Sequence, residues 1–375
     1  MIPFNRPHLT GKEFAYIQEA AQLGQLAGNG EFTRRCHRWL ETQLGASRVL
    51  LCHSGTAALE MAALLLDLKP GDEIIMPSFT FVSTANAFVL RGATPVFVDI
   101  RRDTLNLDER LIEAAISPRT RAIVAVHYAG VSCEMDTVVA VARRHGLVVI
   151  EDAAQGILAS YRGRALGSIG DLGAISFHET KNIICGEGGA LVINDPRYAE
   201  RAEILWEKGT DRSKFSRGEV SKYVWLDIGS SFLPGELTAA VLWAQLEAAE
   251  TITRERVALW QAYHDACAAL REVGVELPVI PPGVTHNGHL FRVLLPHRLS
   301  RQTMLLRLNG RGVNAVFHYV PLHSSPAGRR FGRTAGAMTV TDDCSARLIR
   351  LPLWNGMPSD VPPAVAAQLS ASIQS

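Results

Sequence analysis

The chain has 375 residues, of which 47% are hydrophobic, so it can bury one large core or two medium ones. Its 38 basic and 37 acidic side chains leave a net charge of +1, which excludes a broad polycationic face for nucleic acid and an acidic tail. The first residues lack the order of a signal peptide, and no apolar run approaches the ~18 residues that a membrane span requires. We therefore expect a globular cytoplasmic protein.

The six cysteines are scattered without a C-x-x-C pair, which favours reduced core thiols over a disulfide framework or a zinc site. The twelve histidines show no metal-ligand spacing either. His318 and His323, in HYVPLH, come closest to it, and we expect packing or hydrogen bonding from both. The sequence thus predicts no metal site.

Short apolar runs of strand length alternate with helix-like segments along the chain. We expect strands at 48–52, 73–78, 94–100, 121–128, 147–154, 173–177 and 188–195, and helical segments at 56–68, 84–92, 107–116, 136–146, 196–209 and 236–270. Apolar strands flanked by helices are typical of a mainly parallel sheet covered on both faces.

A proline-rich segment near position 280, ELPVIPPGV, precedes a smaller C-terminal unit with an expected strand at 289–295 and helix at 300–312. The predicted fold class is therefore α/β. We expect a large domain over residues 1–250 and a small α+β domain over residues 251–375.

Ligands of open α/β sheets collect at the carboxyl ends of the strands, so residues that follow the apolar runs are candidates for a binding site. Ser54, Gly55 and Thr56 lead into a helix, where free amides favour phosphate, and an ordinary N-cap is the alternative. Phe81 could lie against a flat ring or in the core. Asp152, after the run LVVI, is either a ligand contact or a helix cap.

Lys181 stands on a polar bend, in SFHETKN, between an apolar strand and the glycine cluster GEGG. A solvated loop lysine is the commoner case, because most lysines are exposed. A Schiff-base lysine is the alternative, since it needs rigid neighbours and a partly desolvated pocket. A phosphate cradle, an aromatic ring, a carboxylate and a lysine together are what pyridoxal phosphate requires.

The segments SGTAAL, PSFTFVSTANA, EDAAQ, SFHETKN and GEGGALVIND resemble the ordered motifs of the DegT/DnrJ/EryC1/StrS sugar aminotransferases, which are fold-type I pyridoxal-phosphate enzymes. The resemblance covers nearly the whole chain. It implies that Lys181 is the catalytic Schiff-base lysine and that Asp152 contacts the pyridine nitrogen. It implies these further cofactor contacts: Gly55, Thr56 and Ser176 at the phosphate, Phe81 on the ring, and Gln155 near the ring hydroxyl.

One departure from the family lies in GSSFL, where many members have an asparagine that reaches the phosphate in the partner subunit. Ser231 stands at the asparagine position and Leu233 at that of an arginine. Because a serine hydroxyl is shorter, we expect Ser231 to make this cofactor contact directly only where the backbone comes close, and otherwise through water. The resemblance implies a homodimer with active sites at the subunit interface.

The resemblance further implies an amino transfer in two halves. Glutamate would give its amino group to the cofactor, and the 4-keto carbon of a dTDP-4-keto-6-deoxy sugar would then receive it, giving dTDP-4-amino-4,6-dideoxygalactose. Lys181 would carry a proton between the substrate carbon and carbon C4′ of the cofactor. The candidates for binding the nucleotide diphosphate, each of which could also be a solvated surface charge, are Arg34, Arg35, Lys208, Arg212 and Lys222.

Other functions remain as alternatives. A nicotinamide-dependent dehydrogenase would need a glycine fingerprint, and the SGTAAL turn offers one glycine. A non-catalytic regulator could share the fold, although the presence of Lys181 and Asp152 argues against it. Family dehydratases have histidine in place of Lys181, which disfavours dehydration. Another nucleotide keto-sugar stays open as the substrate.

Overall fold

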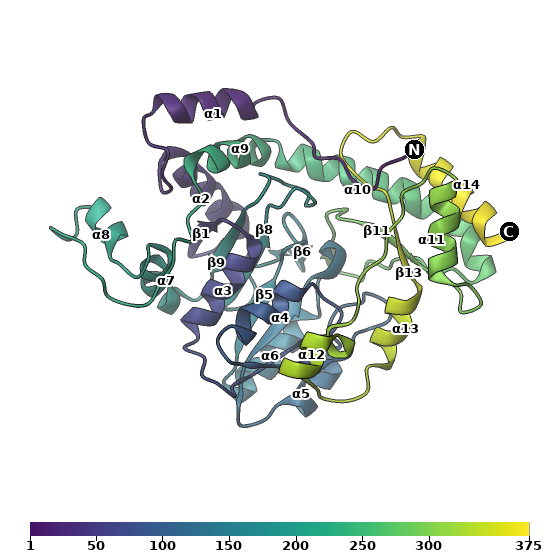
Figure 1. Cartoon of the computed structure of the whole chain (residues 1–375), viewed down its shortest axis with the longest axis horizontal. Coiled ribbons are helices and arrows are strands. Elements are labelled where there is room, and N and C mark those ends of the chain that lie inside the picture. Colours follow the sequence, from purple (N-terminus) through teal and green to yellow (C-terminus); the bar gives the residue numbers. More distant parts are fainter. Residues whose placement is uncertain (375) are drawn as a thin grey trace.

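The computed structural model describes residues 1–374, which fold around an eight-stranded sheet of order β1-β9-β8-β5-β4-β2-β3-β12 (Figure 1). Its strands are β1 Arg48–Cys52, β2 Glu73–Pro77, β3 Thr94–Val98, β4 Thr120–Val126, β5 Val148–Asp152, β8 Leu172–Ser176, β9 Gly189–Ile193 and β12 Arg333–Thr334. Strand β9 is antiparallel to β1 and β8, and the other neighbours are parallel. The predicted α/β class with a mixed, mainly parallel sheet is confirmed.

Helices cover both faces of this sheet. Successive side chains of a strand point to opposite faces, so Ile75 and Ile123 belong to one core while Ile74 and Ala122 belong to the other. The first core includes α2 Glu31–Leu44, α6 Met135–His145 and α9 Glu236–Glu247, and the second includes α3 Gly55–Leu65, α4 Val82–Val89 and α7 Ala199–Trp206. Burial on both faces explains why the strands read as continuous apolar runs.

A second, smaller sheet lies in the C-terminal part of the chain. Strand β11 Phe291–Leu294 pairs antiparallel with β13 Leu348–Leu351, and a separate core joins them to α10 Ala249–Ala266, α11 Arg301–Gly310 and α14 Val361–Gln374. Both chain ends lie on this side of the molecule (Figure 1). The predicted boundary after residue 250 stays a prediction, and the last residue of that predicted domain, Ser375, lies outside the described residues.

Two of the expected helical segments differ from the prediction. The segment 107–116 forms only a short turn followed by α5 Ile112–Ala115. Ile116 is already extended, and Pro118 disfavours helical backbone at the residue before it, so the helix does not continue. The segment 236–270 is divided at Ala248 between α9 and α10.

The remaining elements are short or peripheral. They are α1 Glu13–Gln22, α8 Arg212–Ser216, α12 Pro326–Phe331 and α13 Thr339–Arg347; the 3-10 turns η1 Glu109–Leu111, η2 Tyr128–Gly130, η3 Pro196–Tyr198, η4 Ala268–Val273 and η5 Leu322–Ser324; and a three-stranded sheet of β10 Val284–Thr285, β6 Ser160–Tyr161 and β7 Arg164–Ala165. All six cysteines are free and buried, as predicted. Within residues 1–374, none of the helices combines the length and the apolar character needed to cross a membrane.

Gly173, the second residue of β8, has no room for a side chain. A Cβ atom there would lie 2.2 Å from the carbonyl oxygen of Gly167, a backbone atom that cannot turn aside. Gly173→Ala should therefore lower the free energy of unfolding by about 1–3 kcal/mol in a denaturant titration. Gly310→Ala is the matched control, because a Cβ there meets nothing within 4 Å. Equal stability of the two variants would contradict this explanation.

Candidate active site

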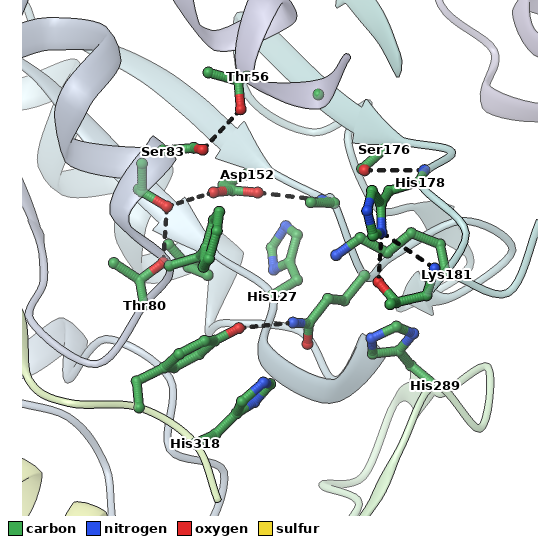
Figure 2. Close-up of a pocket in the computed structure, with 18 of the residues that line it drawn as sticks. Thr56, Thr80, Ser83, His127, Asp152, Ser176, His178, Lys181, His289 and His318 are labelled. Atoms are coloured by element: carbon green, nitrogen blue, oxygen red, sulfur yellow. Dashed lines mark hydrogen bonds between the residues drawn. The ribbon is translucent and has the colours of Figure 1, made fainter. Parts of the chain in front are cut away.

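A cavity of about 640 Å³ opens beside the carboxyl ends of β5 and β8. It brings together seven of the eight predicted cofactor-binding residues: Gly55, Thr56, Phe81, Asp152, Gln155, Ser176 and Lys181. Figure 2 shows the Lys181 side chain reaching into the middle of this cavity, with Asp152 on one side and His289 on the other.

The start of α3 forms one wall of the cavity. Ser54 caps this helix, because its Oγ accepts a hydrogen bond from the N–H of Ala57 at 3.0 Å. The first helical N–H groups, of Gly55 and Thr56, have no partner within the helix. A Cβ at Gly55 would lie 2.9 Å from Cβ of Ser176, so glycine allows the two segments to approach closely. The cap and the phosphate interpretations are therefore compatible, since these amides and the nearby hydroxyls suit a phosphate.

Phe81 precedes α4 and lines the cavity with 57% of its surface exposed. The core aromatic of this segment is instead Phe79, which is fully buried with its ring centroid 5.2 Å from that of Tyr128. The core alternative for Phe81 is therefore wrong, and its ring is accessible to a flat ligand.

Asp152 ends β5 and is buried. Its Oδ2 accepts a hydrogen bond from Thr84 Oγ1 at 2.7 Å, and its Oδ1 accepts one from the N–H of Ala154 at 3.2 Å. Thr80 Oγ1 lies 2.7 Å from the Thr84 hydroxyl and extends this row of hydrogen bonds (Figure 2). The next element after β5 is the strand β6, so the helix-cap alternative for Asp152 is wrong.

Gln155 has the orientation of its amide fixed at both ends. Its Oε1 accepts a hydrogen bond from the N–H of Ala129 at 2.6 Å, and its Nε2 donates to Tyr319 Oη at 3.1 Å. The Tyr319 ring stacks on His318 with a centroid distance of 3.9 Å. These contacts connect the end of β5 to the segment between α11 and η5.

Lys181 lies in the tight connection between β8 and β9. Its backbone N–H donates to the carbonyl of His178 at 2.9 Å. The next residue, Asn182, is buried and donates through Nδ2 to the carbonyl of Asn287 at 2.9 Å, while its Oδ1 lies 2.9 Å from Nδ1 of His289. The backbone that carries the lysine is thus held by a segment more than a hundred positions away in the chain.

The Lys181 amine forms no ion pair or hydrogen bond within residues 1–374. Desolvation lowers the pKa of Lys181 from 10.5 to about 8; the negative charge of Asp152 opposes this shift, and the positive charge of Arg350 adds to it. Part of the amine population is therefore neutral near neutral pH, as a Schiff-base lysine requires. The side chain does not have the open surroundings of a solvated loop lysine.

Three of the histidines that line the cavity are held in place by neighbouring groups. The His127 ring accepts a hydrogen bond at Nδ1 from the N–H of Cys133 at 3.2 Å, and its Nε2 lies 2.8 Å from Glu151 Oε2. Burial, reinforced by nearby cations, lowers the pKa values of His289 and His318. These two rings are therefore neutral at physiological pH.

The two histidines of HYVPLH form hydrogen bonds, as the sequence predicts. Nε2 of His318 lies 2.5 Å from Nη1 of Arg350, and Nδ1 of His323 lies 2.7 Å from Oγ of Ser78. Sequence reasoning missed several further residues that line the cavity: Thr84, His127, His289, Tyr319 and Arg350. One signal was available, since Thr80 and Thr84 have the four-residue spacing that brings side chains together at a helix start.

The other predicted site residues lie outside the cavity. Ser231 is exposed and forms an isolated bridge with Glu207. Its contact with the cofactor of a partner subunit stays a prediction. The basic residues suggested for the diphosphate pair with acidic neighbours or are exposed on this subunit: Arg34, Arg35, Lys208, Arg212 and Lys222. Their role also stays a prediction.

Comparison with known proteins places this chain in a family. Residues 7–370 match the DegT/DnrJ/EryC1/StrS aminotransferase family. The chain belongs to this family. It is 32% identical over 370 residues to the spore coat polysaccharide biosynthesis protein SpsC of Bacillus subtilis, with 96% of this chain and 94% of that protein covered.

Solved structures give the same assignment. The chain is similar to S. venezuelae DesV in complex with a ketimine intermediate, with a TM-score of 0.90, 31% identity and coverage of 100% of this chain and 99% of that one. It is also similar to the aminotransferase TlmJ from Streptoalloteichus hindustanus, with a TM-score of 0.91, 29% identity and the same coverage. These matches confirm fold-type I and the predicted cofactor, pyridoxal phosphate, and they support a sugar aminotransferase.

The cavity itself fits this cofactor. The glycine at position 55 keeps the start of α3 close to Ser176, which leaves amides and hydroxyls for a phosphate. The fixed carboxylate of Asp152 suits a protonated pyridine nitrogen, and the unpaired amine of Lys181 suits an aldehyde.

The pKa of Lys181 predicts how fast the apoprotein captures pyridoxal phosphate at different pH values. Because the lowered pKa makes the neutral, reactive amine predominant above about 8, the capture rate should rise with pH with its inflection near 8, not near 10.5. Stopped-flow absorbance measures this rate. The inflection should move to lower pH in Asp152→Asn, since the charge of Asp152 raises the lysine pKa. An inflection near 10.5 in the wild type would show that the amine is solvated.

Replacement of Asp152 tests the role of its charge. Asp152→Asn should reduce kcat by at least about 10- to 100-fold while most of the cofactor is retained, because a charge-assisted contact contributes about 1.5–3 kcal/mol. Thr84→Val, which removes one hydrogen bond from a neutral hydroxyl to this carboxylate, should raise the activation free energy of turnover by about 1 kcal/mol or less. Steady-state rates and bound-cofactor absorbance report both effects. Wild-type turnover by Asp152→Asn would mean that the carboxylate is structural.

Proposed function

We propose that this protein moves the amino group of glutamate to the 4-keto carbon of dTDP-4-dehydro-6-deoxyglucose, giving dTDP-4-amino-4,6-dideoxygalactose for enterobacterial common antigen. The observation that carries amino transfer is the unpaired, desolvated amine of Lys181 in the same cavity as the buried carboxylate of Asp152. The choice of sugar rests on resemblance in three segments, GEFTRRCHRWLE, EMAALLLDLKPGDE and GSSFL.

Pyridoxal phosphate, when bound, supplies a protonated ring that withdraws electrons from the substrate carbon. The chain's residues maintain the conditions for this. The hydrogen bonds from Thr84 and Ala154 hold both carboxylate oxygens of Asp152 in place, where they would face the ring nitrogen. The start of α3, with Ser176 beside it, would hold the phosphate, and Phe81 would cover the ring.

Lys181 moves the proton in both halves of the reaction. Its Nζ would accept a proton from the substrate carbon and later give it up, and the order would be reversed when the keto sugar is aminated. A pKa of about 8 suits both roles, because the amine can accept and release a proton near neutral pH. Asn182 is held by Asn287 and His289, so the loop that carries Lys181 is fixed and keeps the amine on one side of the cavity.

We infer that the active unit is a homodimer. Residues 223–228 form an exposed apolar segment, and Trp225 within it is 80% exposed. Helix α8, just before this segment, stands away from the body of the subunit (Figure 1). Contiguous apolar surface of this kind marks an interaction site. Ser231 lies three residues after this segment, which supports its proposed approach to the cofactor of the partner subunit.

Two alternatives remain under this proposal. The first is amination of another nucleotide keto-sugar, because the cavity residues that fit the cofactor do not select a nucleotide. The second is a regulator that keeps the fold and the cofactor without turnover. We favour a cytoplasmic enzyme, since nucleotide sugars and glutamate are both available there.

A panel of nucleotide 4-keto sugars with glutamate tests the proposal. We expect amination of dTDP-4-dehydro-6-deoxyglucose at a higher kcat/KM than of UDP-linked sugars, with formation of 2-oxoglutarate, both followed by mass spectrometry. Lys181→Ala is the control and should form no product. Preference for another nucleotide sugar would correct the substrate, and failure to aminate any sugar would contradict the proposed function.

A further inference from the structure

Arg350, in β13, lines the cavity without an acidic partner. Its Nη1 is 2.5 Å from His318 Nε2, which must accept this hydrogen bond because a guanidinium can only donate. Its Nε is buried without a hydrogen-bond partner, and no ion pair of Arg350 forms within residues 1–374. A buried cation without a counter-ion is costly unless a ligand supplies the charge.

The surroundings hold this guanidinium in one orientation. Phe4 lies over its face, with 4.7 Å between Cζ and the ring centroid. His318 is fixed in turn by stacking on Tyr319 and by Tyr128 Oη, 3.3 Å from its Nδ1. Since Nη1 donates its hydrogen bond to His318, the edge of the guanidinium formed by Nε and Nη2 remains without a partner among the described residues. This edge can donate two parallel hydrogen bonds to the two oxygens of a carboxylate.

The carboxylates that line the cavity do not meet this need. Asp152 is bonded to Thr84 and Ala154, and Glu187 is an exposed residue that faces His178 at 3.5 Å. The phosphate cradle lies at the other edge of the site, since Figure 2 shows Thr56 and His318 on opposite sides with the lysine between them. Arg350 is therefore available for a second anion.

The chemistry of the two substrates decides which anion this is. The α-carboxylate of an amino acid is bonded to the same carbon as the reacting amine. In the nucleotide sugar, the ring separates the diphosphate on C1 from the reacting C4. Arg350 lines the cavity, close enough for its charge to act on Lys181. A carboxylate next to the reacting amine comes this close to Lys181, whereas the diphosphate lies on the far side of the sugar ring from the reacting carbon.

We propose that Arg350 binds a carboxylate of the amino donor through Nε and Nη2, with His318 as the residue that positions it. This inference rests on the proposed amino transfer and adds how its donor is recognised. Arg350 contacts the donor in the first half of the reaction and the corresponding 2-oxo acid when that product leaves. The nucleotide sugar is bound by other groups.

The test measures equilibrium binding to the pyridoxal-phosphate form of the full-length protein by calorimetry. The two probes are glutarate, a dicarboxylate without an amine that can react, and dTDP. In Arg350→Gln, glutarate should bind about 10- to 100-fold more weakly, while dTDP binding changes by less than about twofold. Arg350→Lys keeps the charge without the two-pronged edge and should give an intermediate loss. Arg298→Gln, at an exposed arginine outside the cavity, should bind both probes like the wild type.

Unchanged dTDP binding shows that a variant is folded. If Arg350→Gln does not fold, the comparison of Arg350→Lys with the wild type replaces it as the test. The inference is overturned if glutarate binding is unchanged, if both probes weaken equally, if dTDP alone weakens, or if the wild type does not bind glutarate. Loss of glutarate binding in Arg350→Gln together with no product from any keto sugar would leave the carboxylate site standing and refute the sugar substrate. Sugar amination with unchanged glutarate binding would refute the carboxylate site alone.

Discussion

The site depends on one constraint, which is that the Lys181 amine is partly desolvated without a direct partner. A surface lysine would be protonated throughout the physiological range, and a lysine in an ion pair would hold its proton more tightly. The connection between β8 and β9 avoids both outcomes because Asn182, directly after the lysine, is held by Asn287 and His289. The large sheet thus supplies the lysine, and a segment just before the small sheet holds it in place.

The same constraint explains the charge pattern of the cavity. Lys181 and Arg350 are cations without a direct acidic partner, His289 and His318 are kept neutral by burial and nearby cations, and Asp152 is the buried carboxylate of the lining. An unpaired positive charge destabilises the empty site. A cofactor phosphate and anionic substrates restore the balance, so that binding is favoured by charges that the fold has already placed.

The sheet and most of the cofactor residues could be predicted from the sequence. Strands buried on both faces read as apolar runs, and residues such as Asp152 and Ser176 follow from their place at strand ends. His289 and Arg350 could not be found this way, because they reach the cavity only through the packing of a second sheet whose position is not encoded locally. The proposed role of Ser231 depends on another subunit. Its local sequence carries no sign of that contact beyond family resemblance.

Chemical trapping of the cofactor tests the central claim most directly. Reduction of the pyridoxal-phosphate form with borohydride, followed by proteolysis and mass spectrometry, identifies the lysine that carries the cofactor. The chain offers few competitors, of which Lys12, Lys69, Lys208 and Lys222 are exposed. The account predicts a single modified peptide containing Lys181. Modification of another lysine, or stable cofactor binding without any reducible bond, would contradict it.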